Sequence, residues 1–181
     1  MKIYKYPTRE QWADIVERPR LDLNKLNATV EAVLTDVRQR GDEAVKEYER
    51  KFDHADLDSL AVTEAEMDEA DKLVSNELRD AIILAHHNIK VFHISQRFVG
   101  QKVKTQEGVV CWQKSVAIER VGLYIPGGTA PLFSTVLMLA TPAKIAGCRE
   151  IVLCTPPNSE GKVNPAILVA ARIAGVSKIF K

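Results

Sequence analysis

Residues 121–148 read VGLYIPGGTAPLFSTVLMLATPAKIAGC, a glycine- and proline-rich turn that runs directly into an apolar segment. The residues before the turn, 120–125, are short and apolar, as in a buried strand. Pro126-Gly127-Gly128 predicts a turn, and Pro131 suits the first turn of a helix. The stretch therefore predicts a strand, a turn and a helix, which is the repeating pattern of α/β folds.

The turn has features of a ligand-binding site. Gly127 and Gly128 lack a Cβ, so a ligand can approach the main chain, and the start of the next helix attracts phosphate. The segment matches neither the G-x-G-x-x-G nor the P-loop fingerprint. On these residues alone, a ligand-binding turn and a purely structural turn both remain open.

The sequence of this segment resembles that of one protein family. GLYIPGG followed by APLFSTVLMLATPAKIAGC is similar to the N-terminal portion of the histidinol dehydrogenases, NAD-dependent enzymes of histidine biosynthesis. The likeness continues in three further stretches, so it covers nearly the whole chain. They are RGDEAVKEYERKFD at 40–53, NIKVFHISQ at 88–96 and IVLCTPP at 151–157.

The resemblance implies an aldehyde-dehydrogenase-like fold and a four-electron oxidation of L-histidinol to L-histidine through L-histidinaldehyde, with two NAD. It implies zinc at the substrate and a homodimer whose subunits share the active site. It places Tyr124 where the family has an NAD-contacting tyrosine. Gly127, Gly128 and Thr129 are added as cofactor-binding residues from the physics of the helix N-terminus.

In the family, the catalytic and zinc-binding residues follow the part that this chain resembles. No residue is therefore assigned to catalysis or to zinc, and the chain is expected to be an N-terminal fragment that is inactive alone. The alternative is a stand-alone module that binds a nucleotide or associates with itself without catalysis. An open reading frame that continues past Lys181 would favour the enzyme, and a stop codon there would favour the module.

Composition indicates an ordinary globular protein. The 181 residues are 46% hydrophobic and 27% charged, with a net charge of +1. This balance suffices for a core and gives no electrostatic preference for nucleic acid or membrane. No apolar run approaches the ~20 residues of a membrane span, and the first residues do not resemble a signal peptide. The expected compartment is the cytoplasm.

The spacing of the cysteines and histidines does not indicate a metal site. The three cysteines, Cys111, Cys148 and Cys154, lack C-x-x-C spacing and are expected to pack rather than to catalyse. His86 and His93 are seven residues apart on one predicted helix, which is not the i, i+4 spacing of a helical zinc pair. Solvated histidines are the favoured interpretation.

The chain as a whole is predicted to be α/β, with a mainly helical lobe over 1–119 and an incomplete nucleotide-binding domain over 120–181. Thr63 begins a capping box, and the apolar set Leu78, Ile82, Ala85, Ile89 and Phe92 forms one helical stripe. Residues 103–105 and 109–117 predict a β-hairpin at the end of the lobe.

The second domain predicts an incomplete Rossmann-like βαβαβ unit with parallel strands. Its elements are the strand at 120–125, a helix over 132–146, a strand at 150–154, a helix over 163–174 and a strand from 178. Pro142 predicts a kink or break near Thr141. Ligands bind at the carboxyl ends of such strands, which groups 124–129 with 155–158.

Overall fold

The structure is a computed structural model that describes residues 3–18, 24–127 and 131–181. The chain divides into two compact units, Met1–Gly41 and Asp42–Lys181. The first unit contains the 3-10 helix η1 (Arg9–Gln11), the short helix α1 (Trp12–Val16) and the longer helix α2 (Asn24–Arg40). Gly41, at φ +59°, follows α2 in the left-handed conformation that glycine tolerates best.

The second unit begins with helices. They are α3 (Asp42–Tyr48), a π-helical turn η2 (Glu49–Asp53), α4 (Glu64–Leu73) and α5 (Asn76–Ser95). The Thr63 side chain accepts a hydrogen bond from the Glu66 N–H at 3.2 Å, and the Glu66 carboxylate accepts one from the Thr63 N–H at 2.8 Å. The predicted capping box is thus present, and Ser75 caps α5 by accepting from the Leu78 N–H.

The hairpin consists of β1 (Lys102–Gln106) and β2 (Val109–Trp112), paired antiparallel with an irregularity between Lys104 and Gln106. Its second strand ends at Trp112, earlier than the predicted 117. The parallel sheet follows, with β3 (Arg120–Tyr124), β4 (Glu150–Cys154) and β5 (Lys178–Phe180) in the order β3-β4-β5. The predicted mixed fold with parallel strands is confirmed.

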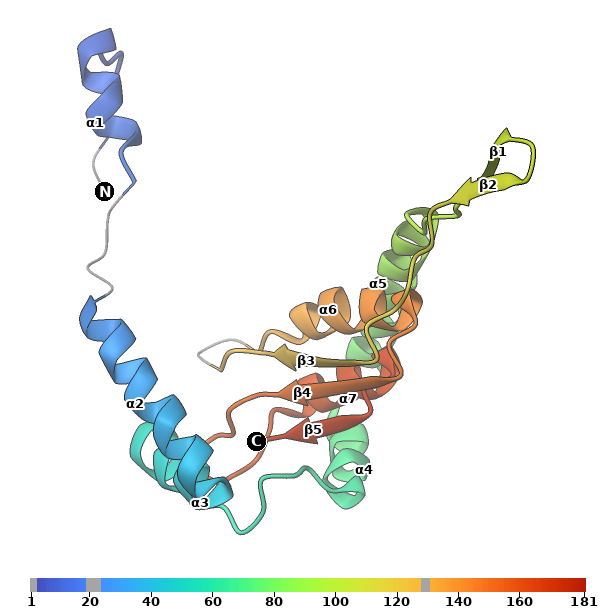
Figure 1. Ribbon diagram of the computed structural model, residues 1–181. Helices are drawn as coiled ribbons and strands as arrows, with labels where there is room; N and C mark the ends of the chain where they lie inside the picture. Colours follow the sequence, from blue (N-terminus) through green and yellow to red (C-terminus); the bar gives the residue numbers. More distant parts are fainter. Residues whose placement is uncertain (1–2, 19–23, 128–130) are drawn as a thin grey trace. The chain divides into compact units, whose positions relative to one another are not determined.

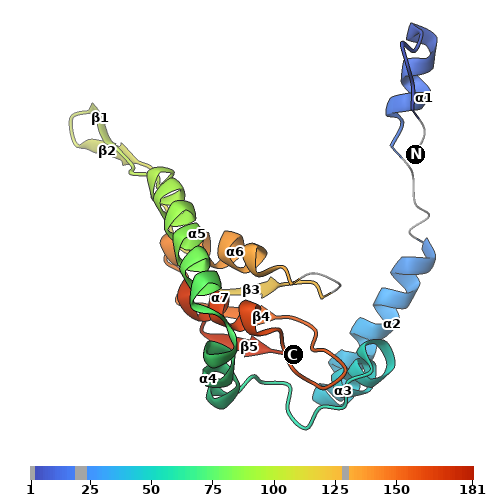
Figure 2. The same ribbon diagram turned by 180° about the vertical axis from the view of Figure 1, so that it is seen from behind.

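Helices α6 (Phe133–Ala146) and α7 (Pro165–Ala174) connect the three strands. Figures 1 and 2 show α5, α6 and α7 on the same face of the sheet. The core lies between that face and the helices, where Val136, Leu137, Leu153, Val169 and Ala171 are almost fully buried. Helix α6 continues through Pro142 without the expected break.

The stripe on α5 is mostly confirmed. Leu78, Ile82, Ala85 and Ile89 belong to the core or pack against it, but Phe92 is 62% exposed. The helical period places Phe92 on the same side as the others, yet it lies one turn beyond the part of α5 that the core covers. The boundary predicted between 119 and 120 falls inside the second unit and stays a prediction.

Candidate functional site

A cavity of about 360 Å³ lies at the carboxyl edge of the parallel sheet. Two loops meet there, one after β3 and one after β4, as the βαβαβ order predicts. The loops contribute Pro126, Gly127, Thr155 and Pro156, and α4 and the start of α7 complete the wall. The structure therefore brings together part of the predicted group, 124–129 with 155–158.

Gly127 has a packing reason as well as the expected freedom of approach. A Cβ built at this position would lie 2.6 Å from Cγ of Pro156, closer than atoms can pack. The missing side chain therefore lets the β3–α6 loop approach the β4–α7 loop. The other two residues of the predicted turn site, Gly128 and Thr129, lie outside the described residues.

Tyr124 does not line the cavity. It is the last residue of β3, in register with Cys154, and it is 64% exposed. Because side chains alternate along a strand and Leu153 faces the helices, Cys154 and Tyr124 share the opposite face of the sheet. Of the predicted cofactor-binding residues that the structure describes, Gly127 lines the cavity and Tyr124 does not. Their roles in cofactor binding stay predictions.

The β4–α7 loop is held by its own polar side chains. The Asn158 side-chain oxygen accepts from the N–H groups of Glu160 and Lys162, at 3.1 and 2.9 Å. Asn164 caps α7, because its side-chain oxygen accepts from the Ala166 N–H at 2.9 Å. Sequence reasoning missed this cap, although Asn followed by Pro165 at the first helical position is its usual signature.

Thr155 supplies an unusual polar group. It is only 2% exposed, and its hydroxyl has no hydrogen-bond partner within the described ranges. Its backbone N–H donates to Phe180 O at 3.1 Å, so this donor is satisfied while the side-chain hydroxyl is not. A buried hydroxyl without a partner is costly unless a guest supplies the hydrogen bond.

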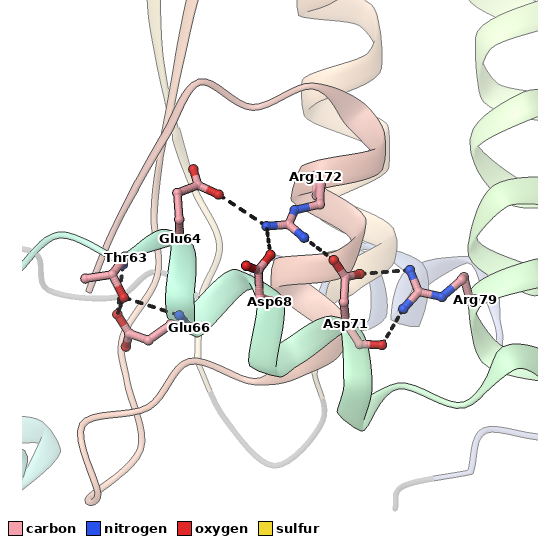
Figure 3. Close-up of polar contacts among 7 residues, drawn as sticks. All are labelled: Thr63, Glu64, Glu66, Asp68, Asp71, Arg79 and Arg172. Atoms are coloured by element: carbon pink, nitrogen blue, oxygen red, sulfur yellow. Dashed lines mark hydrogen bonds and ion pairs between the residues drawn. The ribbon is translucent and has the colours of Figure 1, made fainter.

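The opposite wall is the helix α4, which Arg172 of α7 holds in place. Figure 3 shows the Arg172 guanidinium reaching three carboxylates of α4, those of Glu64, Asp68 and Asp71. Asp71 also accepts from Arg79 of α5 at 2.8 Å. Burial raises the pKa of Asp71, but the hydrogen bonds from Arg79 and Arg172 outweigh it, so its pKa lies below the usual value.

Two more charged pairs lie at the cavity on the α4 side. The Lys162 ammonium lies 3.0 Å from Glu69, and both side chains are about half exposed. Glu66 pairs with Lys181 at 2.5 Å. Desolvation raises the pKa of Glu66, but hydrogen bonds from Lys181 and Thr63 bring it below its usual value. Glu66 is therefore ionised at neutral pH.

The cysteines divide into two groups. Cys148 is buried in the core as expected, whereas Cys111 and Cys154 are exposed. Partial desolvation raises the pKa of the Cys154 thiol, which leaves it mostly protonated and weakly nucleophilic at neutral pH. Packing therefore explains Cys148 and does not explain the other two.

The described residues form neither a metal-binding cluster nor a membrane-spanning helix. Within residues 3–18, 24–127 and 131–181, no three His, Cys, Asp or Glu side chains are grouped so that they could hold a metal ion. This part of the chain does not fit a zinc site. No described helix is both long enough and apolar enough to cross a bilayer.

A three-stranded parallel sheet with a cavity at its carboxyl edge places the chain among the α/β proteins, as an incomplete Rossmann-like unit. The family model of histidinol dehydrogenase matches residues 16–181. The chain belongs to the histidinol dehydrogenase family.

Similar proteins agree with this assignment. Histidinol dehydrogenase of Bacteroides thetaiotaomicron is 63% identical over the whole chain, and that of Bacteroides fragilis is 66% identical. The crystal structure of histidinol dehydrogenase from Elizabethkingia anophelis matches 97% of this chain and 40% of its own, with a TM-score of 0.90 and 44% identity. The chain spans 42% of the length of the two Bacteroides relatives.

Proposed function

We propose that this chain supplies the NAD-binding part of a histidinol dehydrogenase. The whole enzyme would oxidise L-histidinol to L-histidine through L-histidinaldehyde, with two NAD. The observation that supports this most is the membership of residues 16–181 in the family, together with a cavity at the edge of the sheet where α/β proteins bind their ligands.

NAD would be held by the loop after β3. Helix-terminus physics supports Gly127, Gly128 and Thr129 as backbone contacts, because α6 begins without a side-chain cap and the N-terminal end of a helix attracts phosphate. Tyr124, exposed at the end of β3, can cover a ring or donate its hydroxyl. Bound NAD supplies a hydride acceptor, and these residues bind and orient it.

The remaining features of the enzyme are proposed from the family alone. They are zinc at the substrate, a homodimer that shares its active sites and a cytoplasmic location. Because the chain spans 42% of its relatives' length, we also propose that the 181 residues alone do not oxidise histidinol.

Two measurements on the purified 181-residue chain test the proposal. Calorimetric titration with NAD should detect binding, and Tyr124→Ala should weaken it by about tenfold, as expected for loss of an aromatic contact. Tyr4→Ala, at another exposed tyrosine, is the matched control and should leave the affinity unchanged. Absorbance at 340 nm with L-histidinol and NAD should stay constant. Steady NADH production would contradict the inactivity of the chain, and equal affinities would remove Tyr124 from the site.

A second candidate function is that of a self-associating module. β3 is one of the two edge strands of the described parallel sheet, and unpaired strand edges invite pairing with another chain. Light scattering after gel filtration would decide this: a stable oligomer without NAD affinity favours the module over the enzyme.

A further inference from the structure

We propose that Arg172 is a positioning residue: its guanidinium holds one flank of α4 and thereby keeps the opposite flank in place as a wall of the cavity. The inference rests on the proposed function for the identity of the ligand, NAD. It assigns Arg172 no contact with that ligand, because Arg172 acts through the helix that it holds.

Helix α4 has two opposite flanks with different neighbours. Each residue turns the helix by about 100°, so side chains three or four positions apart share a flank. One flank pairs with the guanidinium of Arg172 through the carboxylates of Glu64, Asp68 and Asp71 (Figure 3). The opposite flank lines the cavity with Glu66, Glu69 and Leu73. A rotation of α4 about its axis would therefore move the cavity wall and break the pairs with Arg172 at the same time.

Apolar packing determines the rotation of α4 only weakly. Of its ten residues, all of which the structure describes, Ala70 alone is buried, and Met67 packs against the core while partly exposed. A single methyl group makes few close contacts, and it does not interlock with a neighbouring helix as larger side chains do. Charged contacts therefore have a large share in setting the rotation of this helix.

Arg172 makes three of these charged contacts. Its planar guanidinium lies 3.3 Å from the carboxylate of Glu64 and 3.0 Å from that of Asp68, and it also pairs with Asp71. Asp71 accepts a further hydrogen bond from Arg79, so the network joins α4 to both α7 and α5. Without the Arg172 charge, the neighbouring carboxylates of this flank would repel one another, which favours their rotation toward water.

The position of α4 affects the ligand through the number of molecules that are ready to bind it. A ligand binds to the fraction of molecules whose cavity wall is in place, so its apparent affinity falls in proportion to that fraction. With Arg172 present, the wall is ordered before the ligand arrives. Without it, Glu66 and Glu69 would shift relative to Thr155 and Pro156, which line the cavity from the β4–α7 loop.

The first test measures NAD affinity of the 181-residue chain by calorimetric titration. Arg172→Met keeps an unbranched apolar stem and removes the charge, and it should weaken NAD binding by about fivefold or more. Arg172→Lys should recover part of this loss, because an ammonium can pair with one carboxylate but lacks the planar fork that reaches three. Arg149→Met, which removes the exposed pair with Glu119, is the control and should leave the affinity unchanged.

The second test follows α4 directly and does not depend on NAD. Amide hydrogen exchange, measured by mass spectrometry without ligand, reports local opening of individual segments. In Arg172→Met, the amides of 64–73 should exchange at least about tenfold faster than in the unsubstituted chain, while those of α6 keep their rate. A general loss of stability would accelerate both segments, so the comparison separates positioning of α4 from an effect on the whole fold.

The outcomes separate this inference from the proposed function. If NAD binds to the unsubstituted chain but Arg172→Met binds it equally well, or exchange in α4 is not selectively faster, the positioning role is overturned and the proposed function stands. If NAD does not bind to the unsubstituted chain, the proposed function fails and the exchange measurement decides the inference. Acceleration confined to 64–73 then supports it, and any other result overturns it.

Discussion

At the scale of single residues, small steric and polar details determine what the carboxyl edge of the sheet can do. The glycines of the turn were interpreted from the sequence as room for a ligand. The contact of Gly127 with Pro156 shows that the first of them also lets two loops pack against each other. The same residue type can therefore serve packing and binding at one place.

Gly127→Ala should destabilise the protein, because its Cβ would overlap a proline ring that has little freedom to move. We expect a loss of about 1–3 kcal/mol in the free energy of unfolding, measured by urea denaturation. Gly122→Ala is the control: nothing lies within 4 Å of a Cβ there, and its effect should stay within about 0.5 kcal/mol. Equal stabilities of the two variants would show that the loops separate easily.

Glu49 offers a residue-scale test of pH dependence. Burial raises the pKa of Glu49, the charge of Asp53 raises it further, and one carboxylate oxygen is buried without a partner in the described structure. A raised folded-state pKa means that the stability the group contributes at low pH is lost as the pH rises through that pKa.

Glu49→Gln should therefore raise the melting temperature at pH 7, and the gain should shrink below about pH 4.5, where the unfolded carboxyl is also protonated. Differential scanning calorimetry at the two pH values measures this. Glu107→Gln, in the exposed hairpin turn, is the control and should leave the melting temperature nearly unchanged at pH 7. A larger gain at low pH would contradict the prediction.

At the scale of elements, the position of α4 depends on charges as well as on its apolar face. Capping by Thr63 determines where the helix starts, and Ala70 packs it against the core. Arg172 and Arg79 then tie it to α7 and α5 through Asp71 (Figure 3). This network also holds one wall of the cavity in place.

Asp71→Asn should lower the free energy of unfolding by about 2 kcal/mol at pH 7. The Asp71 side chain is only 25% exposed, and the substitution removes the charge from its hydrogen bonds with two arginines. The folded-state pKa lies below the ordinary 3.8, so the carboxylate stabilises the fold above that value and the contribution is lost as the pH falls through the lower pKa. The difference from the unsubstituted protein should thus shrink below about pH 4.

Urea unfolding at pH 7 and pH 3 measures the effect of Asp71→Asn. Glu119→Gln, whose pair with Arg149 is more than two-thirds exposed on both sides, should cost less than about 1 kcal/mol. A pH-independent loss in Asp71→Asn would indicate lost packing and contradict the electrostatic role.

At the scale of the whole molecule, the chain has two units, and the large core cluster belongs to the second. All its buried members lie between Ala70 and Ile179. Residues 42–181 should therefore fold alone, with a urea midpoint within about 0.5 M of that of the full chain, since the midpoint follows stability. Circular dichroism during urea titration would detect it. A non-cooperative or absent transition would show that the first unit is needed for folding.

Most of the elements could be predicted from the sequence because their signals are local. Thr63, Ser75 and Gly41 mark helix ends through the hydrogen-bonding or backbone conformation of neighbouring residues. One element was missed, and one strand ends earlier than predicted. The π-helical turn at Glu49–Asp53 has no sequence signature of its own, and the hairpin strand stops at Trp112 although suitable strand residues continue beyond it.

The candidate site was predictable only in outline. Strand order placed 124–129 and 155–158 at one edge, and of the described residues the structure brings 126, 127 and 155–158 together around the cavity. The wall formed by α4, the cap at Asn164 and the partnerless hydroxyl of Thr155 were not foreseen. Each depends on segments that approach each other only in the folded chain.

By itself, the sequence determined the order of strand, turn and helix, the parallel sheet and the resemblance to one family. These follow from the short-range pattern of residue types and from the sequence motifs themselves. The tertiary structure alone decided that Arg172 meets Asp71 across 101 residues, and that Tyr124 does not line the cavity. Such pairings depend on long-range packing and on strand alternation in the assembled sheet, and neither is encoded by a local signal.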